Sequence, residues 1–293
     1  MAAAESLRAA WEGGCHEAAW AEYQRLTSAG EACVEAHLIG SMAARERGDL
    51  QGARWAIEKA LEAGPTGMLL VRVWFQRGVL LREVGEAAAA VEQFESCLRH
   101  LGNYPVLRQV MEGPAWYNLG LALRQARRYD EAIAAYQRAV ILFRSEMMTT
   151  HLCMALHNLA WVACLLGRME LAREALDESA PLCSEGALKW HQRIGEAFCM
   201  AQGGLEHQRQ AMELAQEIID HTGDLPADVR SHACWLAGTV ALQLGLCHAA
   251  EDLANQAVHY AVQAKGENRC LLDAADLLRE IRLRHQMHPS VGA

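Results

Sequence analysis

The chain has 293 residues, of which 52% are hydrophobic and 22% are charged, as is usual for a soluble protein with a packed core. Its formal net charge is -9. A surface that is acidic overall repels phosphate backbones, so direct nucleic-acid binding is not expected.

No stretch approaches the roughly 20 apolar residues of a membrane helix, and residues 1–10 lack the features of a signal peptide. The ten cysteines are scattered, without a Cys-x-x-Cys motif, which favours reduced, buried thiols in a cytoplasmic protein.

A pattern of large and small residues begins most clearly at Gly113. Counted from Gly113 as position 1, Gly120 and Ala132 stand at positions 8 and 20, where two antiparallel helices would approach most closely. The larger members of the pattern are spaced so that they fill the remaining space between the helices: Trp116, Leu119, Leu123 and Tyr136 at positions 4, 7, 11 and 24.

The run from Trp116 to Gly120, followed by Tyr129 to Ala132, resembles the tetratricopeptide repeat family. The resemblance implies an all-α, right-handed superhelical solenoid of helical hairpins. Variants of the same template recur around Ser41, Gly78, Ala160 and Gly238, and more loosely around Leu7. We therefore predict about seven hairpins, near residues 1–33, 34–67, 71–104, 113–146, 153–186, 190–224 and 231–265.

These units predict one solenoid domain over residues 1–287, with a C-terminal capping helix at 268–287 and a disordered tail at 288–293. The capping helix carries an apolar face made of Leu271, Leu272, Ala275, Leu278 and Ile281. Because the repeat spacing exceeds the family's usual length of about 34 residues, we expect longer second helices or loops in the middle of the array. In the unit near 190–224, either Ala197 or Cys199 fits position 8.

Proline positions are consistent with this map. Pro105 is predicted to lie between units, Pro114 in the first turn of a helix, and Pro181 at the end of a second helix. None is expected inside a helix, where proline removes a backbone hydrogen bond. Trp74 and Trp116, both at position 4, are predicted core residues.

The family resemblance implies that the first helix of each hairpin lines a concave groove through positions 2, 5, 6, 9, 12 and 13. Asn118 and Asn158 occupy position 6 of adjacent units. A side-chain amide can bond a peptide N–H and C=O at once, so these two residues are predicted to hold an extended peptide. The alternative is a solvated polar face, because asparagine is common at this position in the family.

Eight further residues complete the predicted peptide-binding groove. The arginines are expected to pair with ligand carboxylates, unless they pair with Glu46 and Glu83 instead. The rings are expected to receive apolar side chains, although the extended helices could bury Trp161. The eight are Arg72, Phe75, Arg82, Tyr117, Arg124, His157, Trp161 and Trp235.

Catalytic and metal-binding motifs are missing from the sequence. It contains no phosphate-binding loop, no Gly-x-Ser-x-Gly elbow and no His-Glu-x-x-His motif. His151 and His157 are six residues apart, a spacing that does not place them on one helix face. We therefore expect neither an enzyme nor a bound metal or cofactor.

The pattern as a whole favours a scaffold that binds a peptide or a protein. A second hypothesis follows from the long repeats and the two asparagines, which are similar to those of bacterial peptide-pheromone receptors of the Rap and PlcR-like group. That resemblance implies a peptide-responsive regulator. With the first hairpin beginning near Met1, its output is expected to pass through a partner protein. A third hypothesis is an assembly adaptor that forms homo-oligomers through its outer surface. The identity of the partner does not follow from the sequence.

Overall fold

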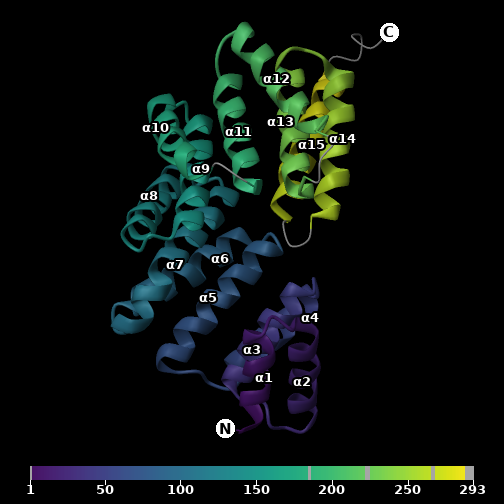
Figure 1. Cartoon of the computed structure of the whole chain (residues 1–293). Coiled ribbons are helices and arrows are strands. Elements are labelled where there is room, and N and C mark those ends of the chain that lie inside the picture. The colour runs from purple at the N-terminus through teal and green to yellow at the C-terminus, as the bar shows by residue number, and fades with distance from the viewer. Residues whose placement is uncertain (1, 184–185, 222–224, 265–267, 288–293) are drawn as a thin grey trace. The chain divides into compact units, whose positions relative to one another are not determined.

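The computed structural model describes residues 2–183, 186–221, 225–264 and 268–287 (Figure 1). These residues contain fifteen α-helices, one 3-10 helix and no strand, which confirms the all-α prediction. Successive helices form hairpins: α1 (Ala2–Glu12) and α2 (His16–Ser28), α3 (Val34–Glu46) and α4 (Leu50–Glu62), α5 (Gly67–Glu83) and α6 (Ala87–Leu101), α7 (Pro105–Gln125) and α8 (Tyr129–Ser145), α9 (Thr149–Leu165) and α10 (Met169–Ser179), α11 (Gly186–Ala201) and α12 (Leu205–Ile219), α13 (Ala227–Gln243) and α14 (Cys247–Gln263). The 3-10 helix η1 (Ala180–Leu182) follows α10, and α15 (Asn268–Met287) follows the last hairpin.

The chain divides into two compact units, Met1–Leu142 and Phe143–Ala293. In the first unit, the first helices contact one another in the order α1, α3, α5 and α7, and each second helix contacts the first helix that follows it. The second unit repeats this scheme, with contacts from α9 to α11, α11 to α13 and α13 to α15. Within each unit the first helices therefore form one continuous layer.

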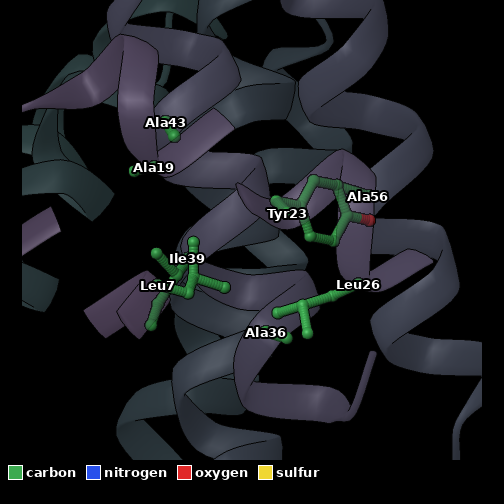
Figure 2. Close-up of a cluster of buried hydrophobic side chains, with 8 residues drawn as sticks. All are labelled: Leu7, Ala19, Tyr23, Leu26, Ala36, Ile39, Ala43 and Ala56. Atoms are coloured by element: carbon green, nitrogen blue, oxygen red, sulfur yellow. The ribbon is translucent and has the colours of Figure 1, made fainter. Parts of the chain in front are cut away.

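The core of the first two hairpins illustrates how the helices are held together (Figure 2). Leu7, Tyr23 and Ile39 are almost completely buried and come from three different helices. Alanines fill the places where two backbones approach, as at Ala19, Ala43 and Ala56. Small and large side chains thus alternate so that the helices pack closely.

The small residue at position 8 packs against the aromatic residue at position 24 of the same hairpin. A Cβ atom on Gly120 would lie 2.6 Å from the ring of Tyr136, and one on Gly78 would lie 2.8 Å from the ring of Phe94. In the second hairpin, the Ser41 hydroxyl donates a hydrogen bond of 3.0 Å to the Ala53 carbonyl, which joins positions 8 and 20. The predicted closest approach of the two helices is therefore confirmed.

The prediction for two prolines was wrong. Helix α7 begins at Pro105 and contains Pro114 in its interior. Pro105 is compatible with a first helical position because the amide there needs no helical partner. Pro114 leaves the Val110 carbonyl without its helical donor, and Val110 is exposed, so water can take that donor's place. Pro181 does follow the end of α10, as predicted.

The extra residues of the middle repeats lengthen both kinds of helix. The second helices α6 and α8 have 15 and 17 residues, compared with 13 in α4. The largest extension is in a first helix, α7, with 21 residues. The expectation of longer second helices was therefore incomplete, because Pro114 does not break α7.

The capping helix turns a slightly different face toward its neighbours than predicted. Ala274, Leu277 and Ile281 are buried, whereas Ala275 is exposed. Leu277 sets this rotation because it fills the space beside Gly238, where an added Cβ would meet its Cδ2 at 3.0 Å. The side chain of Leu272 and the predicted tail at 288–293 lie outside the described residues.

The two tryptophans predicted as core are only partly covered. Trp74 and Trp116 have intermediate exposure. Trp74 packs at the margin of a buried cluster and lies 4.6 Å from the ring of His100, centroid to centroid. Part of each tryptophan side chain therefore remains exposed.

The ambiguous unit departs from the template in its second helix. Ala197 is fully buried and Cys199 is only partly buried, which favours Ala197 at position 8. In α12, however, the first buried residue is Ala211, which lies fourteen residues after Ala197. In the clearest unit, position 20 (Ala132) lies only twelve residues after position 8 (Gly120). Either register therefore matches only one helix of this hairpin.

Replacing Gly120 with alanine tests the close approach of α7 and α8. We expect Gly120→Ala to lower the free energy of unfolding by about 1–3 kcal/mol, because the new methyl group overlaps the Tyr136 ring. Urea denaturation followed by circular dichroism measures the change. Gly102→Ala is the matched control, since a Cβ there meets nothing within 4 Å. An equal loss in both variants would contradict the packing argument.

Candidate peptide-binding surface

The first-helix layer of the first unit carries a group of arginines that share few carboxylates. Arg45 on α3 and Arg82 on α5 both approach the Glu83 carboxylate, at 3.4 and 3.7 Å. Arg45 also pairs with Glu46 at 2.5 Å. Arg72 forms no ion pair with any side chain that the structure describes. This face is therefore rich in positive charge within an acidic protein.

Several polar atoms on the same face are shielded from solvent and lack a hydrogen-bond partner among the described residues. They are Arg45 Nε, Gln76 Nε2, Arg82 Nε and Gln125 Oε1. Counted from the start of each unit, these residues stand at positions 12, 6, 12 and 13, which the family resemblance assigns to the groove. Most buried polar groups in proteins are satisfied. Shielded atoms without a described partner also occur elsewhere, at His16 Nδ1, Arg77 Nε and Gln93 Oε1, but four of them lie on groove positions of α3, α5 and α7.

The aromatic residues of this face pack against rings of the second helix in their own hairpins. Phe75 meets Phe94 edge to face, with ring centroids 5.9 Å apart. Tyr117 lies 6.1 Å from Tyr136. Both Phe75 and Tyr117 keep intermediate exposure, so part of each ring remains accessible. Arg124, at the end of α7, is only 6% exposed and is the least accessible of the three predicted arginines.

Both predicted clamp residues already use one amide proton within their own helix. Asn118 Nδ2 donates to the Pro114 carbonyl at 2.9 Å, and Asn158 Nδ2 donates to the Met154 carbonyl at 2.8 Å. Asn118 is half-buried and Asn158 is 6% exposed. They belong to different units, and a joint clamp remains a prediction.

The second unit contains an aromatic cluster on three consecutive first helices. Trp161 of α9 stacks on Phe198 of α11, with centroids 4.3 Å apart and an interplanar angle of 14°. Trp235 of α13 lies 4.8 Å from Trp161 and 5.6 Å from Phe198. Trp161 is 9% exposed, while Trp235 is more accessible. Phe198 was not predicted as a site residue because it lies in the unit whose register was ambiguous.

A hydrogen-bonded polar network lies beside this cluster. His157 Nε2 contacts Gln192 Oε1 at 2.8 Å, and the Ser179 hydroxyl donates to the same oxygen at 2.6 Å. With the His157 ring neutral, its N–H is the donor in the first contact. Burial lowers the pKa of His157 to about 4, against the opposing hydrogen bond with Gln192. His157 is therefore a neutral, structural hydrogen-bond donor near pH 7.

The predicted residues therefore gather in two groups. Arg72, Phe75, Arg82, Tyr117, Asn118 and Arg124 belong to the first unit, and His157, Asn158, Trp161 and Trp235 belong to the second. Within the described ranges, no three His, Cys, Asp or Glu side chains converge as metal ligands. None of the helices described here combines the length and apolar character needed to cross a bilayer.

This arrangement defines a class of protein: a helical-hairpin repeat protein with a polar and aromatic first-helix layer. Models of the tetratricopeptide repeat family match residues 6–67, 75–146 and 112–185, which together span more than half of the chain. The chain belongs to the tetratricopeptide repeat family, a scaffold that mediates protein binding and is typically non-catalytic. No curated protein matches the sequence.

Solved structures show the same fold at low sequence identity. A tetratricopeptide repeat protein from Parabacteroides merdae has 16% identity and a TM-score of 0.63, over 96% of this chain and 97% of the other. NprR in complex with its cognate peptide NprX has 15% identity and a TM-score of 0.66, over 92% and 79%. The apo form of RapI has 14% identity and a TM-score of 0.61, over 99% and 89%.

Protonation of His157 is expected to destabilise the protein in mild acid. The folded-state pKa of about 4 lies below the ordinary value of 6.5, so the unfolded chain takes up the proton first as the pH falls. The contribution is present above pH 6.5 and is lost between about pH 6.5 and 4. We expect His157→Gln to reduce the pH dependence of the unfolding free energy in this range by about 1–3 kcal/mol.

Urea titrations at several pH values measure this dependence. His37 adds to it in the same direction, because burial also lowers its pKa. The control is His259→Gln, which replaces an exposed histidine. An identical pH profile in wild type and His157→Gln would show that His157 is not the group responsible.

Proposed function

We propose that this chain is a non-enzymatic scaffold that binds an extended, acidic segment of a peptide or protein. The proposed surface is the first-helix face of α3, α5 and α7. Its main support is the set of shielded polar atoms without partners on groove-facing positions. Leaving a buried polar atom unpaired costs about 1–3 kcal/mol, so a ligand that supplies partners recovers part of that cost.

The charges on this face favour an acidic ligand. Arg45 and Arg82 both approach the carboxylate of Glu83, and Arg45 also pairs with Glu46. Arg72 adds a further positive charge on α5. A carboxylate of the ligand can pair with Arg72 or share Arg82, and guanidinium groups suit bidentate pairing. The net charge of -9 on the chain repels acidic segments elsewhere, which confines them to this face.

Apolar ligand side chains are proposed to rest on the accessible parts of Phe75 and Tyr117. In the second unit, Trp235 is the better candidate contact, because Trp161 is already covered by Phe198 and Trp235. Trp161 then holds Trp235 in place instead of touching the ligand. Aromatic residues in this kind of position often dominate the energy of an interface.

A second candidate is a peptide-responsive regulator that acts through a partner protein. NprR, which shares the fold, has been solved with its cognate peptide. For this chain, the proposal requires that a bound peptide change the preferred conformation of the repeats. Small-angle scattering with and without a bound acidic peptide tests it, and an unchanged radius of gyration at saturation would argue against regulation.

Neutralising two arginines is expected to weaken the binding of acidic peptides. A peptide array in which acidic sequences are matched with their Asn and Gln versions supplies the probes. We expect the acidic members to bind preferentially, and Arg72→Gln with Arg82→Gln to lower their affinity at least 10-fold. Each lost charge-assisted hydrogen bond contributes about 1.5–3 kcal/mol. Fluorescence anisotropy at two salt concentrations measures the affinities.

The matched control is Arg54→Gln, which removes an exposed arginine from the second helix α4, where it pairs with Glu86 at 3.0 Å. It is expected to leave peptide affinity unchanged. Equal binding of acidic and neutral peptides, or equal losses from the α4 and α5 variants, would contradict the proposed surface.

The asparagines are expected to contribute less than the arginines. Because each amide group already donates to its own helix, we expect Asn118→Ala with Asn158→Ala to reduce affinity for the selected acidic peptide by about 10-fold at most. Circular dichroism checks that the helices persist. Unchanged affinity would remove both asparagines from the proposed site.

A further inference from the structure

Two cysteines from neighbouring first helices meet at the edge of the second unit. Cys164 stands next to the last residue of α9, and Cys199 lies near the end of α11. Their Sγ atoms are 3.0 Å apart, so they must approach by only about 1 Å to reach the length of a disulfide bond. They are 35 residues apart in the sequence, and only the packing of α9 against α11 brings them together.

One member of the pair opens onto a pocket. Cys164 is 2% exposed, whereas Cys199 is partly exposed and lines a pocket of about 380 Å³. The rim of this pocket also includes Arg173, Met200 and His207. Two carboxylates, Asp177 and Glu196, also line it. A small disulfide that carries both carboxylate and ammonium groups can therefore find opposite charges on this lining when it reaches Cys199.

The electrostatic surroundings suit Cys199 as the attacking thiol. The hydrogen bond from Cys164 lowers the pKa of Cys199 and the charge of Arg173 adds to this effect, whereas burial and the charge of Glu196 oppose it. The same hydrogen bond, together with burial, raises the pKa of Cys164. The accessible thiol is thus the more readily ionised one, and thiolates are the reactive species in disulfide exchange.

We propose that Cys164 and Cys199 form a reversible disulfide through exchange with a small carboxylate-bearing disulfide of the glutathione type. The Cys199 thiolate attacks one sulfur of the small disulfide and forms a mixed disulfide, releasing the first small thiolate. The Cys164 thiol then loses its proton and attacks Cys199 Sγ, which releases the second. The net reaction converts two protein thiols and one small disulfide into one protein disulfide and two small thiols.

A second close pair provides an internal comparison. Cys153 and Cys183 have Sγ atoms 2.8 Å apart, but their exposed fractions are 0% and 3%. Burial is also the first cause of the raised pKa of Cys183, about 12. A thiol that is both buried and protonated reacts slowly with a solvent-borne oxidant. The structure thus distinguishes an oxidisable pair from an inert one of similar separation.

The disulfide fixes α9 to α11 beside the aromatic cluster. Cys164 is one turn beyond Trp161 on α9, and Cys199 directly follows Phe198 on α11. Oxidation therefore holds the two helices that carry the Trp161–Phe198 stack at one spacing. Any effect of this constraint on ligand binding rests on the proposed function, whereas formation of the disulfide does not.

The test exposes the full-length protein to a series of ratios of oxidised to reduced glutathione at neutral pH. Free thiols are then alkylated, and the digested protein is mapped by mass spectrometry. We expect a cross-linked peptide containing Cys164 and Cys199 that appears with increasing oxidised glutathione and disappears with dithiothreitol. Cys153 and Cys183 are expected to remain alkylatable after unfolding. Oxidation is also expected to raise the midpoint of thermal unfolding.

Variants separate the pair from the other thiols. Cys199→Ser is expected to abolish both the cross-link and the thermal shift, and Cys164→Ala to leave a glutathione adduct on Cys199. Cys247→Ser, which replaces another partly exposed cysteine of the second unit, is expected to retain both effects. The proposal is overturned if oxidised wild type carries free Cys164 and Cys199, if Cys199 keeps only a glutathione adduct, or if Cys153–Cys183 is the pair that forms. Peptide affinity plays no part in these outcomes.

Discussion

The contact between the small residue at position 8 and the ring at position 24 is the constraint on which the rest of this structure depends. In the hairpin of α7 and α8, Gly120 leaves room for the Tyr136 ring, and Gly78 does the same for Phe94. In the hairpin of α3 and α4, Ser41 at position 8 instead donates a hydrogen bond to the Ala53 carbonyl, so a small residue at this position again lets the two helices approach closely. The first helices then contact one another in sequence, and their remaining faces form one layer in each unit.

In that layer, the residues that pack the hairpins differ from those that we propose to contact a ligand. Both helices of a hairpin supply packing residues, as in the cluster of Leu7, Tyr23 and Ile39 (Figure 2). The outward positions of the first helices are released from that task and can carry arginines, amides and rings. Shielded atoms such as Gln76 Nε2 lack partners there. Unsatisfied polar groups reduce stability, which the packing of the hairpins offsets.

Much of the fold followed from spacing, and the failures have physical causes. Pro114 was placed in the first turn of a helix because proline usually breaks a helix interior, but one lost hydrogen bond on an exposed segment is tolerated when the rest of α7 is packed. The buried face of the capping helix differs from the predicted one by a shift of one residue. Leu277 fills the space beside Gly238 on another helix, and the local sequence pattern does not show that space. The register of the unit containing Ala197 was ambiguous because the first buried residue of its second helix, Ala211, lies fourteen residues after Ala197. In the hairpin of α7 and α8, the matching distance from Gly120 to Ala132 is twelve residues.

The sequence by itself determined the fold class and the pairing of successive helices, because these depend on residue size repeated at fixed intervals along the chain. It also placed Arg72, Phe75 and Arg82 together on one helix. Only the tertiary structure decided which of the predicted residues remain accessible. Trp161 is covered by Phe198, Asn158 is turned back onto its own helix, and Cys164 meets Cys199. The Asn158 bond is local, to a carbonyl four residues earlier. The contacts of Trp161 and Cys164 join side chains distant in sequence, and helical periodicity does not show which partner such a side chain meets in the fold.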